Sequence, residues 1–205
     1  MISKKMNPRT SKIAMFPLNT FLLPGEEIPL KIFEPRYKQL INECDESGMT
    51  FGIPFILDNL ITSYGCEVEL QSIVAKNSLN EMVVTVKCIR NFHLLDFYDE
   101  LPGKLYGGGD IEYVNDTFKS NNPELAVLIK KLKLEISPKL GSITADSSID
   151  LVNVAKSLFM KSEDKYTFYS FRDQQRMEKF LIKQLQFYDL IKRQEEILQY
   201  NFTLN

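Results

Sequence analysis

The side chains most suited to metal binding or nucleophilic chemistry are three cysteines and one histidine. Cys44, Cys66 and Cys88 recur at intervals of 22 residues, but the residues around them do not repeat. A zinc site needs a fourth ligand and usually contains a CxxC or HxxxH pair, and neither pair occurs. A nucleophilic serine or cysteine would depend on His93, which lies in a strand-like segment. We interpret the cysteines as small buried thiols and His93 as an ordinary strand residue, and we predict no metal site and no catalytic residue.

Phosphate-binding motifs are also missing. GxxxxGK[ST] does not occur, and Gly107-Gly108-Gly109 has no lysine or helix start after it, so we interpret the glycines as a bend or a bulge. Adjacent carboxylates such as Glu26 and Glu27 are expected on solvated surfaces. The sequence predicts a protein without cofactor and without enzymatic activity. A serine–lysine dyad stays open, because its partners can be far apart in the sequence.

The composition is that of a globular protein with one domain or two small ones. The chain has 205 residues, of which 44% are hydrophobic and 25% charged. Its net charge of −2 and its pI of about 5.6 argue against nucleic acid or an anionic membrane as partner. No apolar segment follows the basic N-terminus, and none approaches the ~18 residues that span a bilayer. We expect a cytoplasmic protein without membrane association; the sequence does not indicate its oligomeric state.

The elements that position these residues have a strand period in the first half of the chain. Cys66, Val68 and Leu70 alternate with polar residues, and β-branched residues fill 82–89, which predicts a hairpin with a loop of about five residues. Other extended segments are expected at 13–18, 27–33, 92–97 and 110–114. Prolines in the earlier ones place them at edges or bends. Short strands at irregular angles favour a small, partly open β-barrel.

One helix is predicted inside this half. Pro35 stands at its first position, Gly48 is a suitable stop, and one face is apolar. That face consists of Tyr37, Leu40, Ile41 and Cys44.

After Asn115 the apolar residues take a helical period. Helices are predicted from Asn122 to Pro138, from a cap at Ser147 or Ser148 through Phe159, and from Asp173 to Tyr200, with a short aromatic piece at 166–171. The apolar face of the last helix is expected to be packed, and it consists of Met177, Phe180, Leu181, Leu185, Tyr188, Ile191 and Leu198. The change of period divides the chain into a β-rich subdomain, 10–117, and a helical subdomain, 118–205.

Residues 15–37 contain an unusual run of prolines and glycine in fixed register. The run resembles the opening of the Lon N-terminal, or substrate-binding, domain family, whose pattern is FPL-x5-PG-x3-PL-x-IFEPRY. Weaker similarities continue along most of the chain, at Phe51-Gly52-Ile53, Gly65-Cys66-Glu67-Val68, Arg90-Asn91-Phe92 (with Asn91 in place of an arginine) and Asp173-Gln174-Gln175-Arg176.

The resemblance implies an α+β fold, in which a PUA-like, partly open β-barrel precedes a C-terminal helical bundle. It also implies recognition of a polypeptide or protein partner without catalysis. The ATPase and protease of full-length Lon are not expected, because the sequence ends at Asn205. Since PUA-like barrels include RNA readers, RNA binding is the alternative; the acidic pI and the lack of a basic cluster on the strands argue against it.

Phe33, Glu34, Arg36 and Tyr37 are the candidate binding residues, and two interpretations of them stay open. In the first they are architectural: Tyr37 packs in the core, and Glu34 and Arg36 satisfy the backbone or pair. In the second, Phe33 and Tyr37 lie near a groove where an extended peptide adds to an exposed strand edge.

Overall fold

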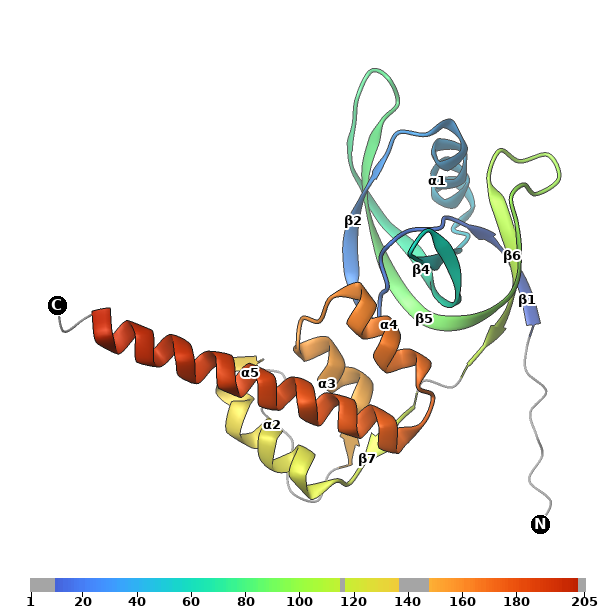
Figure 1. The fold of residues 1–205 in the computed structure, drawn as a ribbon. Helices are drawn as coiled ribbons and strands as arrows, with labels where there is room; N and C mark the ends of the chain where they lie inside the picture. The colour runs from blue at the N-terminus through green and yellow to red at the C-terminus, as the bar shows by residue number, and fades with distance from the viewer. Residues whose placement is uncertain (1–9, 115–116, 137–147, 203–205) are drawn as a thin grey trace, which may run out of the picture. The chain divides into compact units, whose positions relative to one another are not determined.

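The computed structural model describes residues 10–114, 117–136 and 148–202 (Figure 1). The chain divides into two compact units, Met1–Asp116 and Thr117–Asn205, and each is described by itself. Strands form most of the first unit and helices most of the second, which confirms the predicted α+β class.

Six strands and one helix form the first unit. The strands are β1 (Thr10–Met15), β2 (Glu27–Ile32), β3 (Phe51–Leu57), β4 (Leu60–Lys76), β5 (Met82–Tyr98) and β6 (Gly107–Tyr113), and the helix is α1 (Pro35–Ser47). Their order in the sheet is β2-β5-β4-β3-β1-β6, and a further pairing of β5 with β6 closes the last five into a ring. β1 has one ladder pair with β3, Met15 with Gly52, and the parallel contact continues just beyond β1, where the Phe16 and Leu18 amides donate to Gly52 O and Pro54 O at 2.8 and 3.1 Å.

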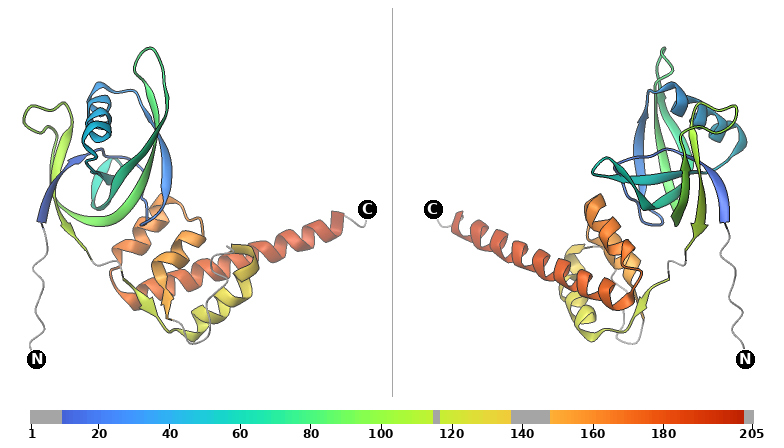
Figure 2. Two further views of the ribbon diagram at one scale, coloured as in Figure 1. Left: turned by 180° about the vertical axis from the view of Figure 1, so that it is seen from behind. Right: turned by 45° about the vertical axis from the view of Figure 1, so that its right-hand side comes forward.

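The two central strands are longer than the sequence predicted. β5 runs unbroken through 82–98, where two strands were expected, and it curls around the barrel with β4 (Figure 2). Register shifts, for example between Leu94 and Asp96, let it bend as it passes from β4 to β6. Alternation within each part is visible in the sequence, but the bulges that join the parts have no sequence signal.

The Pro24-Gly25 pair builds the turn that leads into β2. The Glu26 amide donates to Leu23 O at 3.0 Å, and Gly25 has a φ of 88°, as a type II turn requires at its third position. The Gly25 amide then donates to Cys88 O at 2.8 Å, and the Cys88 amide to Glu26 O at 2.9 Å. This pattern is a glycine bulge, so the family-like Pro-Gly pair sets the register of β2 on β5.

The triple glycine is part of strand β6, so its interpretation as a bend or bulge is wrong. Gly108 and Gly109 pair with both β1 and β5 where the ring closes, and Gly107 pairs with β1. A Cβ on Gly107 would lie 2.5 Å from Tyr98 O, and one on Gly109 would lie 2.7 Å from Asp96 O. The glycines are therefore needed for close backbone approach, and the irregularity lies on the partner strand β5.

The second unit contains α2 (Pro123–Ile136), α3 (Leu151–Ser157), α4 (Ser162–Ser170) and α5 (Gln174–Phe202). It also holds a small ladder of β7 (Lys119–Ser120) and β8 (Ile149–Asp150), which the sequence did not indicate because each strand has two residues. Its buried apolar residues on α2 and α5 are Leu125, Ile129, Leu132, Met177, Leu181, Ile182 and Leu185.

The start and end of α3 differ from the prediction. Asp150, and not a serine, caps the helix, because its carboxylate accepts from the Val152 and Asn153 amides at 3.0 and 3.1 Å. Ser148 precedes β8, and Ser147 and Pro138 lie outside the described residues. The helix ends at Ser157, and Phe159 beyond it is 85% exposed with a φ of 48°.

Candidate functional site

Three of the four candidate residues surround the turn between β2 and α1. Phe33 follows β2 and is 55% exposed. Glu34 occupies the N-cap position of α1 but makes no capping bond with its side chain. Its Oε2 instead accepts from Arg36 Nε at 2.9 Å and lies 2.9 Å from Nη2, so the carboxylate and the guanidinium neutralise each other.

Tyr37 is part of the core beneath this turn. It is 6% exposed, its ring stacks on Phe16 with centroids 3.7 Å apart, and burial raises the pKa of its phenol. The Arg36 guanidinium covers the ring at 4.6 Å. Tyr37 therefore packs beneath the turn with little of its surface exposed.

The loop between β4 and β5 carries Leu79, an exposed apolar residue that the sequence analysis did not include among the candidates. Asn77 organises the loop, since its Oδ1 accepts from the Leu79 and Glu81 amides at 3.0 and 2.9 Å. Lys38 of α1 donates to Leu79 O at 2.9 Å, which ties the loop to the helix after Phe33. Leu79 is 72% exposed. An apolar residue inside the polar run KNSLN is the signal that would have found it.

We name Phe33, Val74 and Leu79 the hairpin-end surface. Val74 lies near the end of β4, in a register shift between Ile73 and Ala75, and is 63% exposed. Ile32 pairs with Met82 at the first residue of β5, so Phe33 leaves the sheet at the same end. Three exposed apolar side chains therefore occur at the end of the ribbon formed by β2, β5 and β4.

β2 is an edge strand whose open side is poorly suited to a further strand. The Cys88 amide donates to Glu26 O, and bonded positions alternate along an antiparallel pair. The backbone of Pro29 therefore faces away from β5, and the open edge lacks a donor at its middle. The sequence had placed this proline at an edge or bend, and the structure places it at an edge.

The other end of α1 is fastened to the loop before β6. Glu43 Oε2 accepts from Lys104 Nζ at 2.7 Å and from the Tyr106 hydroxyl, and Gln39 Oε1 accepts from the Leu105 amide at 2.9 Å. The Lys104 hydrogen bond, followed by that of Tyr106, lowers the pKa of Glu43. Burial, followed by the bond to Glu43, raises the pKa of Tyr106.

The barrel also contains one charged side chain that is almost fully enclosed. Glu67 is 3% exposed; its carboxylate accepts from Arg90 Nε at 2.7 Å and from the Thr50 hydroxyl at 2.6 Å. The Arg90 guanidinium lies 3.9 Å from the centroid of the Tyr113 ring. The hydrogen bond to Glu67 raises the pKa of Arg90. This ion pair lies within the barrel and gives Arg90 of the segment Arg90-Asn91-Phe92 a structural role.

The residues first considered for chemistry all lie in the barrel unit. The three cysteines are buried thiols within one apolar core cluster. His93 Nδ1 is 3.9 Å from a Glu112 oxygen, and its ring lies 5.2 Å from that of Tyr64. In the described part of the chain, no three His, Cys, Asp or Glu side chains are arranged to hold a metal ion.

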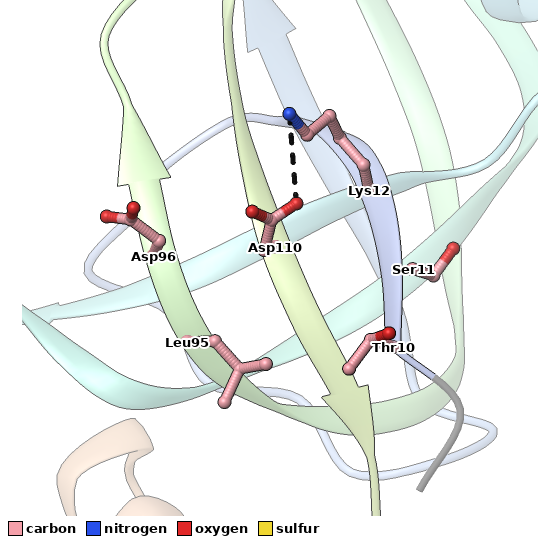
Figure 3. Close-up of a pocket in the computed structure, with 6 residues that line it drawn as sticks. All are labelled: Thr10, Ser11, Lys12, Leu95, Asp96 and Asp110. Atoms are coloured by element: carbon pink, nitrogen blue, oxygen red, sulfur yellow. Dashed lines mark ion pairs between the residues drawn. The ribbon is translucent and has the colours of Figure 1, made fainter.

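A shallow hollow of about 390 Å³ occurs where β5, β6 and β1 lie side by side (Figure 3). Asp110 stands at its centre, accepts from the Tyr98 hydroxyl and lies 3.9 Å from Lys12 Nζ. Asp96 pairs with Asp110 across the strands. The Tyr98 hydroxyl and Lys12 are partners of the Asp110 carboxylate, so no bound ligand is needed to explain this acidic group in the hollow.

Comparison with known proteins identifies the family. The model of the ATP-dependent protease La (LON) substrate-binding domain matches residues 12–198. The chain belongs to this family. No match was found among curated protein sequences. No helix within the described residues has the length and apolar character needed to cross a bilayer.

Two solved structures of Lon N-terminal domains share the fold. A Lon N-terminal domain protein from Xanthomonas campestris has 23% identity and a TM-score of 0.63, over 83% of this chain and 97% of that one. The N-terminal domain of the Mycobacterium avium complex Lon protease has 13% identity and a TM-score of 0.62, over 86% and 98% of the two chains. They show the same fold, and the family model over residues 12–198 confirms the family resemblance that residues 15–37 indicated.

Proposed function

We propose that this protein binds polypeptides without catalysis, and that the hairpin-end surface of Phe33, Val74 and Leu79 contacts them. Membership of a substrate-binding domain family supports the general function. The observation that supports the location is the exposure of Phe33 and Leu79 on segments held by hydrogen bonds, at 55% and 72%. Apolar side chains on a preorganised surface bind with little loss of conformational entropy.

Contact through side chains is favoured over addition of a strand. Pro29 removes a donor from the β2 edge. The other open stretch, the second half of β4, has register shifts at Leu70/Ser72 and Ile73/Ala75 that twist it. We therefore propose that Phe33 and Leu79 insert between side chains of an extended or unfolded segment, while Glu34 and Arg36 border the contact and Tyr37 supports it.

RNA is the rival partner, and the pairing of charges here argues against it. Arg36 is neutralised by Glu34, and Lys87 lies 3.1 Å from a Glu27 carboxylate oxygen. Phosphate binding by Arg36 or Lys87 would have to replace these internal pairs, although phosphate contacts supply most of the affinity for nucleic acid. The expected cytoplasmic location and the absence of a cofactor stay predictions.

Fluorescence anisotropy with a permanently unfolded polypeptide tests the proposal. The probe is reduced, carboxymethylated α-lactalbumin, compared with mixed-sequence single- and double-stranded RNA, each at low and physiological salt. We expect polypeptide binding that changes little with salt, because its contacts are apolar. The double variant Phe33→Ser, Leu79→Ser should weaken it at least about tenfold, or ~1.4 kcal/mol.

The matched control is Leu60→Ser, since Leu60 is 71% exposed at the β3–β4 turn of the same barrel. It should leave the affinity unchanged. Equal weakening by the control would place binding elsewhere. Steeply salt-dependent RNA binding without polypeptide binding would show that the protein is an RNA reader.

A further inference from the structure

Helix α5 carries a second face that its own unit leaves uncovered. One face is packed: Met177, Leu181 and Leu185 are fully buried, and Asp189 accepts from Lys131 of α2 at 2.6 Å. The C-terminal half of α5 extends beyond α2, α3 and α4 in both views (Figures 1 and 2). In that half Phe187, Leu190 and Ile197 are 60%, 53% and 61% exposed. The predicted packed face of α5 does not continue along the whole helix: Tyr188 and Ile191 are 38% and 37% exposed, and the Leu198 side chain lies outside the described part of the chain.

The uncovered residues form one line along the helix, opposite the packed face. At 100° per residue the line occupies an arc of about 80°. All of its residues are exposed, and they are Arg176, Lys179, Lys183, Phe187, Leu190, Gln194 and Ile197. We name this line the α5 stripe. Its N-terminal half is basic and its C-terminal half is apolar.

The spacing of the apolar half is that of a helix-pairing seam. Phe187, Leu190, Gln194 and Ile197 follow one another at steps of 3, 4 and 3 residues, which keeps them on the facing side of a second helix. A single polar residue in such a seam is common and fixes the register. An isolated helical segment of this length is only marginally stable in water, so pairing would also stabilise it.

The basic half lacks carboxylate partners of its own. Arg176, Lys179 and Lys183 form no ion pair with any residue that the structure describes. By contrast, Lys131 and Arg193, nearby on α2 and α5, both pair with Asp189. The three cations are therefore free to meet an external acidic group.

We propose that the α5 stripe docks a partner protein through an amphipathic helix, apolar at one end of its seam and acidic at the other. Its apolar residues would cover Phe187, Leu190 and Ile197, and its carboxylates would pair with Arg176, Lys179 and Lys183. This docking is independent of the hairpin-end surface, which lies in the other unit.

A second copy of the chain has the wrong charges for this stripe. A parallel pair would set the basic halves against each other. An antiparallel pair overlapping along the whole stripe would set each basic half on the apolar half of its partner. An anionic membrane also fits poorly, because basic and apolar residues follow each other end to end, and Asp189 and Glu195 flank the apolar half.

A display library of three-heptad helical peptides tests the proposal. The seam positions are randomised among Leu, Glu, Lys and Ser, and selection is made on the whole chain. We expect selected peptides with leucines at one end of the seam and glutamates at the other. Their affinity, measured by anisotropy, should fall at least about tenfold with Lys179→Glu, Lys183→Glu and with Leu190→Asp. Val127→Asp is the control, since Val127 is 66% exposed on α2.

Each other outcome overturns the proposal. These outcomes are failure to select peptides, selection of lysine as readily as glutamate, and equal loss of affinity with Val127→Asp. Dimerisation that Leu190→Asp abolishes in sedimentation equilibrium would identify a second copy as the occupant. Binding to phosphatidylserine vesicles without peptide binding would identify a membrane. Circular dichroism of each variant confirms that α5 is intact.

Discussion

Different kinds of internal contact stabilise the barrel unit and the helical unit. In the barrel, strands far apart in the sequence approach backbone to backbone, as at Gly109 beside Asp96, and Arg90 neutralises the enclosed Glu67. In the helical unit the contacts are between side chains on helix faces, and α5 leaves one face uncovered. Substitutions in the barrel should therefore act through backbone spacing and enclosed charge, and those in the helical unit through apolar faces and helix caps.

The largest effect is expected from cavities, which should act on both units alike. Leu40 in α1 and Leu181 in α5 are fully buried. Replacing either by alanine should lower the free energy of unfolding by about 2–5 kcal/mol. Urea denaturation with hydrogen exchange resolved by unit measures the change. If the two units unfold separately, each variant should affect only its own unit. An unchanged midpoint for Leu40→Ala would mean that the α1 face is not core.

The next largest effect is expected from the ion pair of Arg90 with the enclosed Glu67, because the described part of the helical unit has no equivalent pair. Arg90→Ala leaves the enclosed Glu67 carboxylate without its charged partner, and should cost about 2–3 kcal/mol, somewhat less than a fully buried pair since the Arg90 side chain is 49% exposed. The control Lys87→Ala breaks an exposed pair and should cost at most about 1 kcal/mol. Equal losses in thermal denaturation would show that enclosure of Glu67 is unimportant.

The next effect on stability is expected where the backbones of β5 and β6 approach closely at Gly109. Gly109→Ala places a Cβ 2.7 Å from Asp96 O and 2.8 Å from Met15 Cε, and the backbone oxygen cannot move freely. We expect a loss of about 1–3 kcal/mol, as for other overpacked sites. A variant as stable as the wild type would show that β5 and β6 can separate without cost.

In the helical unit the corresponding local effect is loss of a cap. Asp150→Ala removes the acceptor for the Val152 and Asn153 amides and should cost ~1 kcal/mol. Asp150→Asn keeps an acceptor oxygen and should retain most of the stability. Chemical denaturation of the three proteins tests this, and identical losses in both variants would show that charge, and not capping, matters here.

The smallest effect concerns pH. The pKa of Glu43 is lowered in the folded chain, chiefly by Lys104, so its contribution is present above the unfolded pKa and is lost as pH falls through the folded one. Because the Glu43 side chain is partly solvated, the loss should not exceed about 1 kcal/mol. Glu43→Gln should flatten this part of the stability profile below neutral pH. An unaltered profile would mean that the anchored loop does not contribute.

The sequence by itself determined the class of fold and the family, for reasons that are local. Alternation at 66–70 places Cys66 and Val68 in the core, although it does not predict the enclosure of Glu67 between them. Helical spacing at 177–185 reports the buried side of α5, and Pro24-Gly25 and Pro35 favour a turn and a helix start through their local conformation. The single apolar face of α1 was predicted for the same reason, and it is buried as expected.

Only the tertiary structure decided which candidate residues are accessible. Phe33 and Tyr37 are both aromatic and close in sequence, yet one is exposed and the other buried beneath Arg36. Leu79 became a candidate because Lys38, distant in sequence, holds its loop. The strand assignment of Gly107–Gly109 and the uncovered face of α5 likewise depend on neighbours far along the chain. A residue's local period shows that it has a preferred side, but long-range packing determines what covers that side.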